Sequence, residues 1–477
     1  MNPIKTKSKM KKTMKKFLSI AALALMGAVM TGCSSDDDSF TSNQQQFENK
    51  SKVVTLTTTV SLDGSAGTRA LTSTGVKTFA AGETMAVIYH NGSSLVKAES
   101  NALTDGDITN EGRNATFTFD LETPDKSVDV TYIYPAAMAN ADGTINYDAL
   151  ETQDGTLATI ANNLDLATYT AEWAGDNLPT ATLNNQLAIL AITLKDNATT
   201  PNDLTSSTTG LTIKDGTNHY SVSRSAVAGP IYVAIHPTTS ANITITATDG
   251  TKKYGKYLTS KTYDASNGYT VNWEMYKMAA SAEAGDMEKL LCTAGHIHAD
   301  EADAKCTATR VAKIFYVGSE TCESAYGFTH GLALGLTDAS TGCAWGPMST
   351  VSNAKQYNDV TFQPESGLMY NSYSTDHNND NYPAFKNAIA YNSGVAPAEC
   401  SDWFLPSAYQ LQTMITAVGG HVNLREKANL DYTAATGYYW VCTETGTSLA
   451  LRYYFGDGNF YYVDKNGSRR VRAALAF

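Results

Sequence analysis

The sequence is poor in cysteine, in charged residues and in long apolar runs, and each shortage narrows what the protein can be. Only seven of its 477 residues are cysteine, and Cys33 is the only one among the first 291. A lone thiol cannot form a disulfide within that stretch, so the stretch is not a disulfide-rich scaffold. The uncharged apolar run at residues 17–30 is shorter than the ~20 residues that a membrane-spanning helix needs.

Basic residues and catalytic motifs are also scarce. The chain has 35 lysines and arginines against 47 acidic residues, and seven of the lysines lie in residues 5–16. Without residues 1–32 the balance is 28 against 47, a formal net charge of −19. Such a charge excludes nucleic-acid binding through the net field. The sequence shows no G-x-S-x-G, Walker, strand–helix G-x-G-x-x-G or H-E-x-x-H motif, which weighs against an enzyme.

What is present begins with an export signal. The lysine-rich start, the apolar run and the small residues that follow predict a signal peptide over 1–32. Val29-Met30-Thr31-Gly32-Cys33 loosely resembles the lipobox of bacterial lipoproteins. This resemblance implies cleavage before Cys33 and acylation of its thiol and new amino group, and each buried CH₂ then contributes ~0.8 kcal/mol to membrane attachment. The alternative is an inert cysteine in an ordinary secretory signal.

Residues 33–50 are polar and predict a tether. The SSDDD after Cys33 resembles the signal that sends lipoproteins of Bacteroidetes-type bacteria to the outer face of the outer membrane. A solvated spacer is the alternative.

From residue 51 to about 278 the pattern is that of a β-protein. Apolar residues alternate with polar ones from Val54 to Leu62, and further short strands follow at intervals broken by turn residues. Residues 185–195, NQLAILAITLK, are apolar on both faces and predict a central strand. Short, regularly spaced strands without long helical periods predict a sandwich or barrel.

After residue 279 the residue pattern changes to one that predicts both helices and strands. Ser407 and Gln410 have capping-box spacing before a helical repeat that stops at Gly419-Gly420, and a second helix is expected after Pro383. Asp457-Gly458 and Asn466-Gly467 predict hairpins in a closing meander. Disulfides are plausible in an oxidising compartment, with a pairing that the sequence does not choose, among six cysteines: Cys292, Cys306, Cys322, Cys343, Cys400 and Cys442.

Residues about 50–278 resemble fimbrillin-like proteins of the Bacteroidales, the subunits of type V pili and related surface lipoproteins. The matching stretches include GTRALTSTG, VDVTYIYPA, NQLAILAITLK and YVAIHPTTSANITITATDG, in the order of the family. The resemblance implies two transthyretin-like β-sandwiches, at 51–178 and 179–278, and a surface or fimbrial location.

Residues 279–477 resemble a second module, found at the C-termini of bacterial surface proteins and similar to the C-type-lectin-like fold. The motifs are Trp403-Phe404-Leu405-Pro406-Ser407, Tyr439-Trp440 before Thr443-Glu444, and the final strand at residues 471–477. Val441 and Cys442 stand where the common form has serines. The combination of both resemblances implies a pilus tip or accessory adhesin.

Arg69-Ala70 lies in the Gly/Ser/Thr-rich break after the first predicted strand. In the pilus-forming family an Arg-specific protease cuts at such a site. The resemblance therefore implies removal of the first strand and its replacement by a strand from a neighbouring subunit. The alternative is an ordinary exposed arginine in a loop.

Three further clusters are candidate binding sites. His296 and His298 alternate near Cys292 and Cys306, but close Cys-x-x-Cys spacing is absent, so surface histidines and no metal are expected. Asp376 and Asp380 lie in an oxygen-rich run without the spacing of a calcium loop, so Ca²⁺ is a minor alternative to a turn. Tyr453 and Tyr461 flank the Asp457-Gly458 turn and are tentative ligand contacts, with core packing as the alternative.

The sequence as a whole predicts an outer-surface lipoprotein, related to fimbrillins, that binds other subunits and a surface glycan or protein without being an enzyme. One alternative is a glycan-binding lipoprotein that does not polymerise. The other is a glycan-degrading enzyme.

Overall fold

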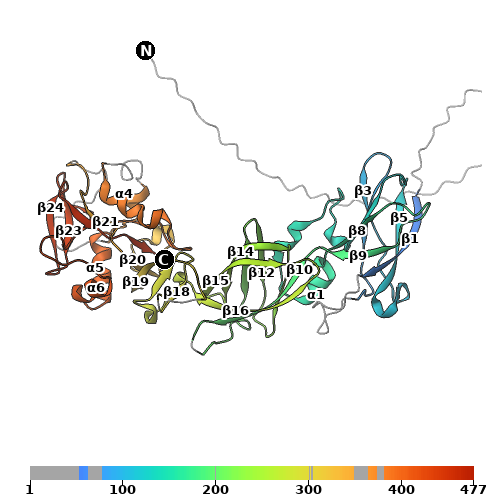
Figure 1. Cartoon of the computed structure of the whole chain (residues 1–477), viewed down its shortest axis with the longest axis horizontal. Coiled ribbons are helices and arrows are strands. Elements are labelled where there is room, and N and C mark those ends of the chain that lie inside the picture. Colours follow the sequence, from blue (N-terminus) through green and yellow to red (C-terminus); the bar gives the residue numbers. More distant parts are fainter. Residues whose placement is uncertain are drawn as a thin grey trace, which may run out of the picture. The chain divides into compact units, whose positions relative to one another are not determined.

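The computed structural model describes residues 53–62, 78–198, 200–299, 301, 305–348, 364–372 and 381–477. Within them the chain is mainly β, as predicted, with helices concentrated after residue 364 (Figure 1). The predictions for Cys33, Arg69, Ala70, Asp376 and Asp380 lie outside the described residues. Within the described part of the chain, no helix has the length and apolarity needed to cross a membrane.

The first sheet contains eight of the described strands in the order β3-β2-β6-β8-β9-β1-β5-β4. Alternate residues of these strands point into one core that includes Phe117, Phe119 and Tyr132. The strands are β1 (Val53–Leu62), β2 (Ala86–His90), β3 (Leu95–Glu99), β4 (Ile108–Thr109), β5 (Asn114–Glu122), β6 (Val130–Tyr134), β8 (Ala167–Ala171) and β9 (Ala181–Asn185).

The second sheet has the order β13-β10-β16-β15-β14-β11-β12-β7. Strand β10 is buried along most of its length between β13 and β16, as its two apolar faces predicted. Its strands are β7 (Thr152–Gln153), β10 (Ala188–Asp196), β11 (Gly210–Asp215), β12 (Asn218–Ser223), β13 (Ile231–Ile235), β14 (Thr238–Thr248), β15 (Lys253–Tyr263) and β16 (Gly268–Lys277).

The two sheets do not divide the chain at residue 178. Strand β9 follows that position but belongs to the first sheet, whereas β7 precedes it and pairs with β12 of the second. After β7 the chain forms α1 (Leu157–Thr159) and a short π-helix at Ile160–Leu164. Buried Ile160 and Leu164 of this π-helix join the core of the second sheet. Sequence spacing alone does not reveal this exchange, because strand membership depends on long-range pairing.

After residue 279 the chain is α+β. One sheet has the order β18-β17-β19-β20-β26 and another the order β21-β25-β22-β23-β24. The strands are β17 (Leu290–Cys292), β18 (Ile297–His298), β19 (Arg310–Val317), β20 (Gly331–Gly335), β21 (Ser340–Cys343), β22 (Tyr438–Glu444), β23 (Leu449–Tyr454), β24 (Asn459–Asp464), β25 (Arg469–Val471) and β26 (Ala474–Ala476).

The helices of this part are α2 (Met369–Ser372), α4 (Pro383–Ile389), α5 (Ala408–Ala417) and α6 (His421–Lys427). The predicted capping box is confirmed: Ser407 Oγ accepts from the Gln410 amide, and the Gln410 side chain accepts from the Ser407 amide.

Of the two hairpins predicted for the closing meander, the structure contains the first and lacks the second. Strands β23 and β24 form the hairpin at Asp457-Gly458. Strand β25, however, does not pair with β24; it crosses back to lie beside β22 and β21, and β26 pairs with β20 in the other sheet. This crossing places Val471 and Leu475 in a shared core.

Candidate functional site

Strand β1 fills a gap between two strands that lie far away in the sequence. It pairs antiparallel with β5, from Val53 opposite Glu122 to Ser61 opposite Asn114. On its other side, Val60–Leu62 pair in parallel with Ala181–Leu183 of β9. Figure 1 shows β1 beside β5. This ten-residue strand therefore pairs with β5 along most of its length and with β9 at its C-terminal end.

The burial of β1 increases along the strand. Val53 is 53% exposed, whereas Val60 is fully buried in the first core. Thr58 is also buried, and its hydroxyl donates to the Pro179 carbonyl at 2.6 Å. The Tyr132 hydroxyl donates to the same carbonyl at 2.8 Å, so β1 and β6 share one acceptor. The C-terminal half of β1 is thus the part that the core depends on.

The hairpin β23–β24 has one buried and one open aromatic face. Tyr453 is 1% exposed and packs against Phe455 and Phe460, so its proposed role as a ligand contact is wrong. Tyr461 is 37% exposed, and its hydroxyl donates to Asp457. The two residues differ because their positions on neighbouring strands have opposite parity in the register.

The open face continues from Tyr461 onto Arg452 and Tyr438, which the sequence motifs did not single out. The Arg452 guanidinium lies 3.8 Å from the Tyr438 ring centre and 5.9 Å from that of Tyr461. Tyr438 in turn stacks on Tyr454 at 4.4 Å. We call Tyr438, Arg452, Tyr454 and Tyr461 the aromatic face. The spacing of Arg452 and Tyr454, two residues apart in β23, was the available signal. Only the register shows that Tyr438 and Tyr461 are their neighbours.

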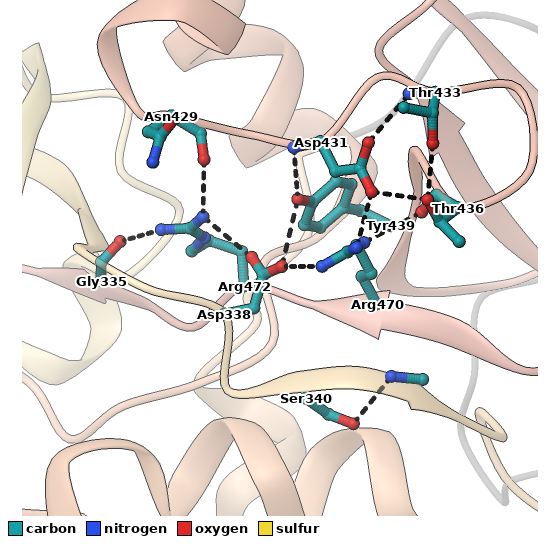
Figure 2. A network of polar contacts seen from close by, with 11 residues as sticks. Gly335, Asp338, Ser340, Asn429, Asp431, Thr433, Thr436, Tyr439, Arg470 and Arg472 are labelled. Atoms are coloured by element: carbon teal, nitrogen blue, oxygen red, sulfur yellow. Dashed lines mark hydrogen bonds and ion pairs between the residues drawn. The ribbon is translucent and has the colours of Figure 1, made fainter.

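The final motif strand has a structural role. The Asp338 carboxylate lies between two guanidinium groups (Figure 2). Its Oδ2 accepts from Arg470 Nη1 at 2.7 Å, and its Oδ1 lies 2.8 Å from Arg472 Nη2. Arg472 also donates to the Gly335 carbonyl at 2.9 Å, and Arg470 pairs with Asp431 at 2.6 Å. Nearly buried guanidinium groups are stable only when paired, so this network holds the end of the chain in place.

Partial burial raises the pKa of Asp431, but other groups outweigh it. Hydrogen bonds from Thr436 and Thr433 and the charge of Arg470 lower the pKa of this carboxyl to about 2. Burial also raises the pKa of Tyr439 to about 12, and its hydroxyl accepts a hydrogen bond from the Asp431 amide at 2.9 Å. The network therefore keeps the Asp431 carboxylate charged and the Tyr439 phenol neutral at neutral pH.

The other motif residues also serve the core. Trp403 and Phe404 are buried, and the Thr443 hydroxyl donates to the buried Glu365 carboxylate at 2.7 Å. Burial raises the pKa of Glu323, which accepts from the Gln410 side chain at 2.7 Å. These contacts lie in the interior of the α+β part, so these motif residues have a structural role.

The cysteines and histidines differ from expectation. No disulfide joins the six cysteines described, which are free thiols: Cys292, Cys306, Cys322, Cys343, Cys400 and Cys442. His296 and His298, expected on the surface, are 2% and 1% exposed. The expectation of surface histidines is therefore wrong, because β18 pairs with β17 and turns both rings inward.

No protein-family model matches the sequence, and comparison with curated proteins gave no significant match. Among solved structures the chain resembles a fimbrial protein from Bacteroides ovatus, at 13% identity and a TM-score of 0.35, over 88% of this chain and 99% of that one. It also resembles a fimbrial assembly protein from Parabacteroides distasonis, at 11% identity and a TM-score of 0.28, over 47% and 95% of the two chains. TM-scores this low assign neither a fold family nor a function.

Proposed function

We propose that this chain is a fimbrillin-like subunit of the bacterial cell surface that joins a fibre by exchange of its first strand. The observation that carries the proposal is the place of β1, a single strand that fills the gap between β5 and β9 and supplies Val60 and Leu62 to the first core. The resemblance of residues about 50–278 to fimbrillin-like proteins supports the same function.

Cleavage after Arg69 would cut the chain between β1 and β2, in a segment outside the described residues. Strand β1 would then be held by hydrogen bonds and packing alone. Its departure would leave unpaired backbone groups on β5 and β9 above an apolar floor, an arrangement that recruits another strand. A donor strand from a neighbouring subunit needs apolar side chains at alternate positions to replace Val60 and Leu62.

The remaining parts of the proposal concern anchoring and adhesion. Acylated Cys33 delivers the subunit to the outer membrane before cleavage, and removal of residues 33–69 releases it into the fibre. The lectin-like module from residue 279 contacts a surface glycan or protein through the aromatic face. Stacking on the exposed Tyr461 ring and pairing with Arg452 suit a polar ligand that has apolar patches.

The test is maturation by an Arg-specific surface protease in cells that assemble pili. We expect the wild-type chain to be trimmed near Arg69 and to appear in purified pili. The Arg69→Ala variant should keep its N-terminal segment and stay in the membrane fraction. Arg224→Ala, which changes an arginine elsewhere in the chain, is the matched control and should behave as wild type.

Two results would contradict strand exchange. One is a wild-type surface form that retains residues 33–69 and stays acyl-anchored, which favours the non-polymerising glycan-binding lipoprotein. The other is normal incorporation of the Arg69→Ala variant into pili.

A further inference from the structure

Two cysteines and two histidines meet in one buried cluster at the start of the α+β part. The side-chain donor atoms of Cys292, His296, His298 and Cys306 all lie within 4.8 Å of one another. All four residues are buried. Nothing in the strand-exchange function uses them, and a buried polar cluster needs a reason to be kept.

The β17–β18 hairpin brings three of the four donors together. Cys292 ends β17, and its amide donates to the His296 carbonyl at 3.1 Å across the turn. His296 and His298 are two residues apart on an extended segment, so they share a face. Gly295 allows the turn: it has φ +77°, and a Cβ there would collide with the Ala398 carbonyl.

Cys306 completes the cluster from the segment that precedes β19. Its Sγ lies 3.6 Å from His296 Nδ1. The other ring nitrogen, Nε2, lies against the backbone of Gly255. A side chain at Gly255 would place its Cβ only 2.6 Å from Nε2. Nδ1 is therefore the nitrogen that His296 offers to the cluster. In a tetrahedral site with metal–sulfur bonds of ~2.3 Å and metal–nitrogen bonds of ~2.0 Å, two donor atoms lie about 3.3–3.8 Å apart. The 3.6 Å between Cys306 Sγ and His296 Nδ1 falls in this range.

The surroundings resemble those of a closed structural site. Tyr276 stacks on His296 with ring centres 5.3 Å apart and also contacts His298 at 4.7 Å, which fixes both imidazoles. Tyr276 and the two cysteines form an apolar cluster with Ala294 and Ala308. The Arg310 guanidinium donates to the Cys306 and Ala308 carbonyls at 3.2 Å and 2.5 Å, which holds the loop that carries Cys306.

We propose that Cys292, His296, His298 and Cys306 bind one structural Zn²⁺. A donor set of two sulfurs and two nitrogens suits zinc, whereas Ca²⁺ and Mg²⁺ require oxygen ligands. Two thiolates neutralise the ion, and binding from the thiol form releases two protons. His296 also lines a cavity of ≈ 340 Å³, which offers an entry path. The ion ties the β17–β18 hairpin to the segment before β19.

The experiment measures metal and thiols in the whole chain, purified in detergent without chelators. We expect about one zinc per chain by mass spectrometry of the elements. Co²⁺ exchanged into the site should give the visible bands and thiolate charge-transfer band of a tetrahedral S₂N₂ centre. In the Cys292→Ser/Cys306→Ser variant both signals should be lost, and a chelator should lower the melting temperature of the wild type only.

Cys322→Ser is the matched control, because this cysteine lies outside the cluster; it should keep the zinc and the cobalt spectrum. His298→Gln guards against a variant that fails to fold, since it should alter the cobalt spectrum while leaving the thiolate band. A Cys292–Cys306 disulfide in the purified protein would overturn the proposal. Free thiols that take up neither Zn²⁺ nor Co²⁺ would overturn it as well, and neither result bears on strand exchange.

Discussion

The Lys465 ammonium and the Glu444 carboxylate form an ion pair in which neither side chain has any exposed surface. Glu444 ends β22, and Lys465 lies where the chain leaves β24 to cross back toward β25. Lys465 also donates to the Thr447 carbonyl at 3.1 Å and lies 4.8 Å from the Trp345 ring centre. Because an unpaired buried charge is costly, this pair favours the crossing over a simple meander.

Removing one member of this pair should destabilise the α+β part strongly. We expect Glu444→Gln or Lys465→Met alone to lower the free energy of unfolding by about 3–5 kcal/mol, because each leaves a buried charge or polar group without its partner. The double variant should lose less than the sum of the two single losses. Urea unfolding followed by tryptophan fluorescence measures all three. Additive losses would contradict a direct pairing.

Two valines of β1 provide a matched test of the first core. Val60 is fully buried and Val53 is 53% exposed, yet they belong to the same strand. Val60→Ala should lower the free energy of unfolding by about 2 kcal/mol, whereas Val53→Ala should change it little. Synthetic peptides of residues 53–62 that carry these substitutions should show the same ranking in their affinity for the gap between β5 and β9 of protease-trimmed protein. Equal binding of the two variant peptides would mean that the gap between β5 and β9 does not select for apolar side chains.

Acid should weaken the network around Asp431. Its folded-state pKa of about 2 lies below the ordinary value of 3.8 for an aspartate, so the unfolded state binds more protons between these values. The stabilisation is therefore complete above about pH 4 and is lost as the pH falls through 2. The difference in unfolding free energy between wild type and Asp431→Asn should shrink over this range. Thr436→Val, which removes a hydrogen-bond donor, should move the loss to higher pH.

The aromatic face can be separated from the core beneath it. On an array of glycans and matrix proteins, Tyr461→Ala and Arg452→Gln should weaken binding of the whole chain about tenfold, or ~1.4 kcal/mol. Their melting temperatures should stay close to that of the wild type. Tyr453→Ala should instead unfold more easily by about 3–5 kcal/mol, because it empties part of the core. Undiminished binding by both surface variants would place the ligand elsewhere.

Short-range interactions determine the elements that the sequence predicted. The capping box of Ser407 and Gln410, the helix after Pro383 and the hairpin at Asp457-Gly458 all formed as expected. Each depends on hydrogen bonds or φ/ψ preferences within a few residues. The alternation in β1 likewise predicted which side chains turn inward.

Long-range pairing was beyond the reach of these patterns. Asn466-Gly467 marks a turn, but nothing local says that β25 crosses to β22 and does not pair with β24. The register of β22, β23 and β24 likewise decided that Tyr453 enters the core while Tyr461, one strand away, faces out.

By itself the sequence determined that this is a mainly β chain with a separate α+β part, since alternation, turn residues and helix caps act within neighbouring residues. Only the tertiary structure decided that β1 seals a gap between β5 and β9, and that His296 and His298 turn inward to meet Cys292 and Cys306. The physical reason is that a side chain becomes buried only when another segment of the chain packs against it. A strand shows from its own residues which face is apolar, but not which distant segment will cover it.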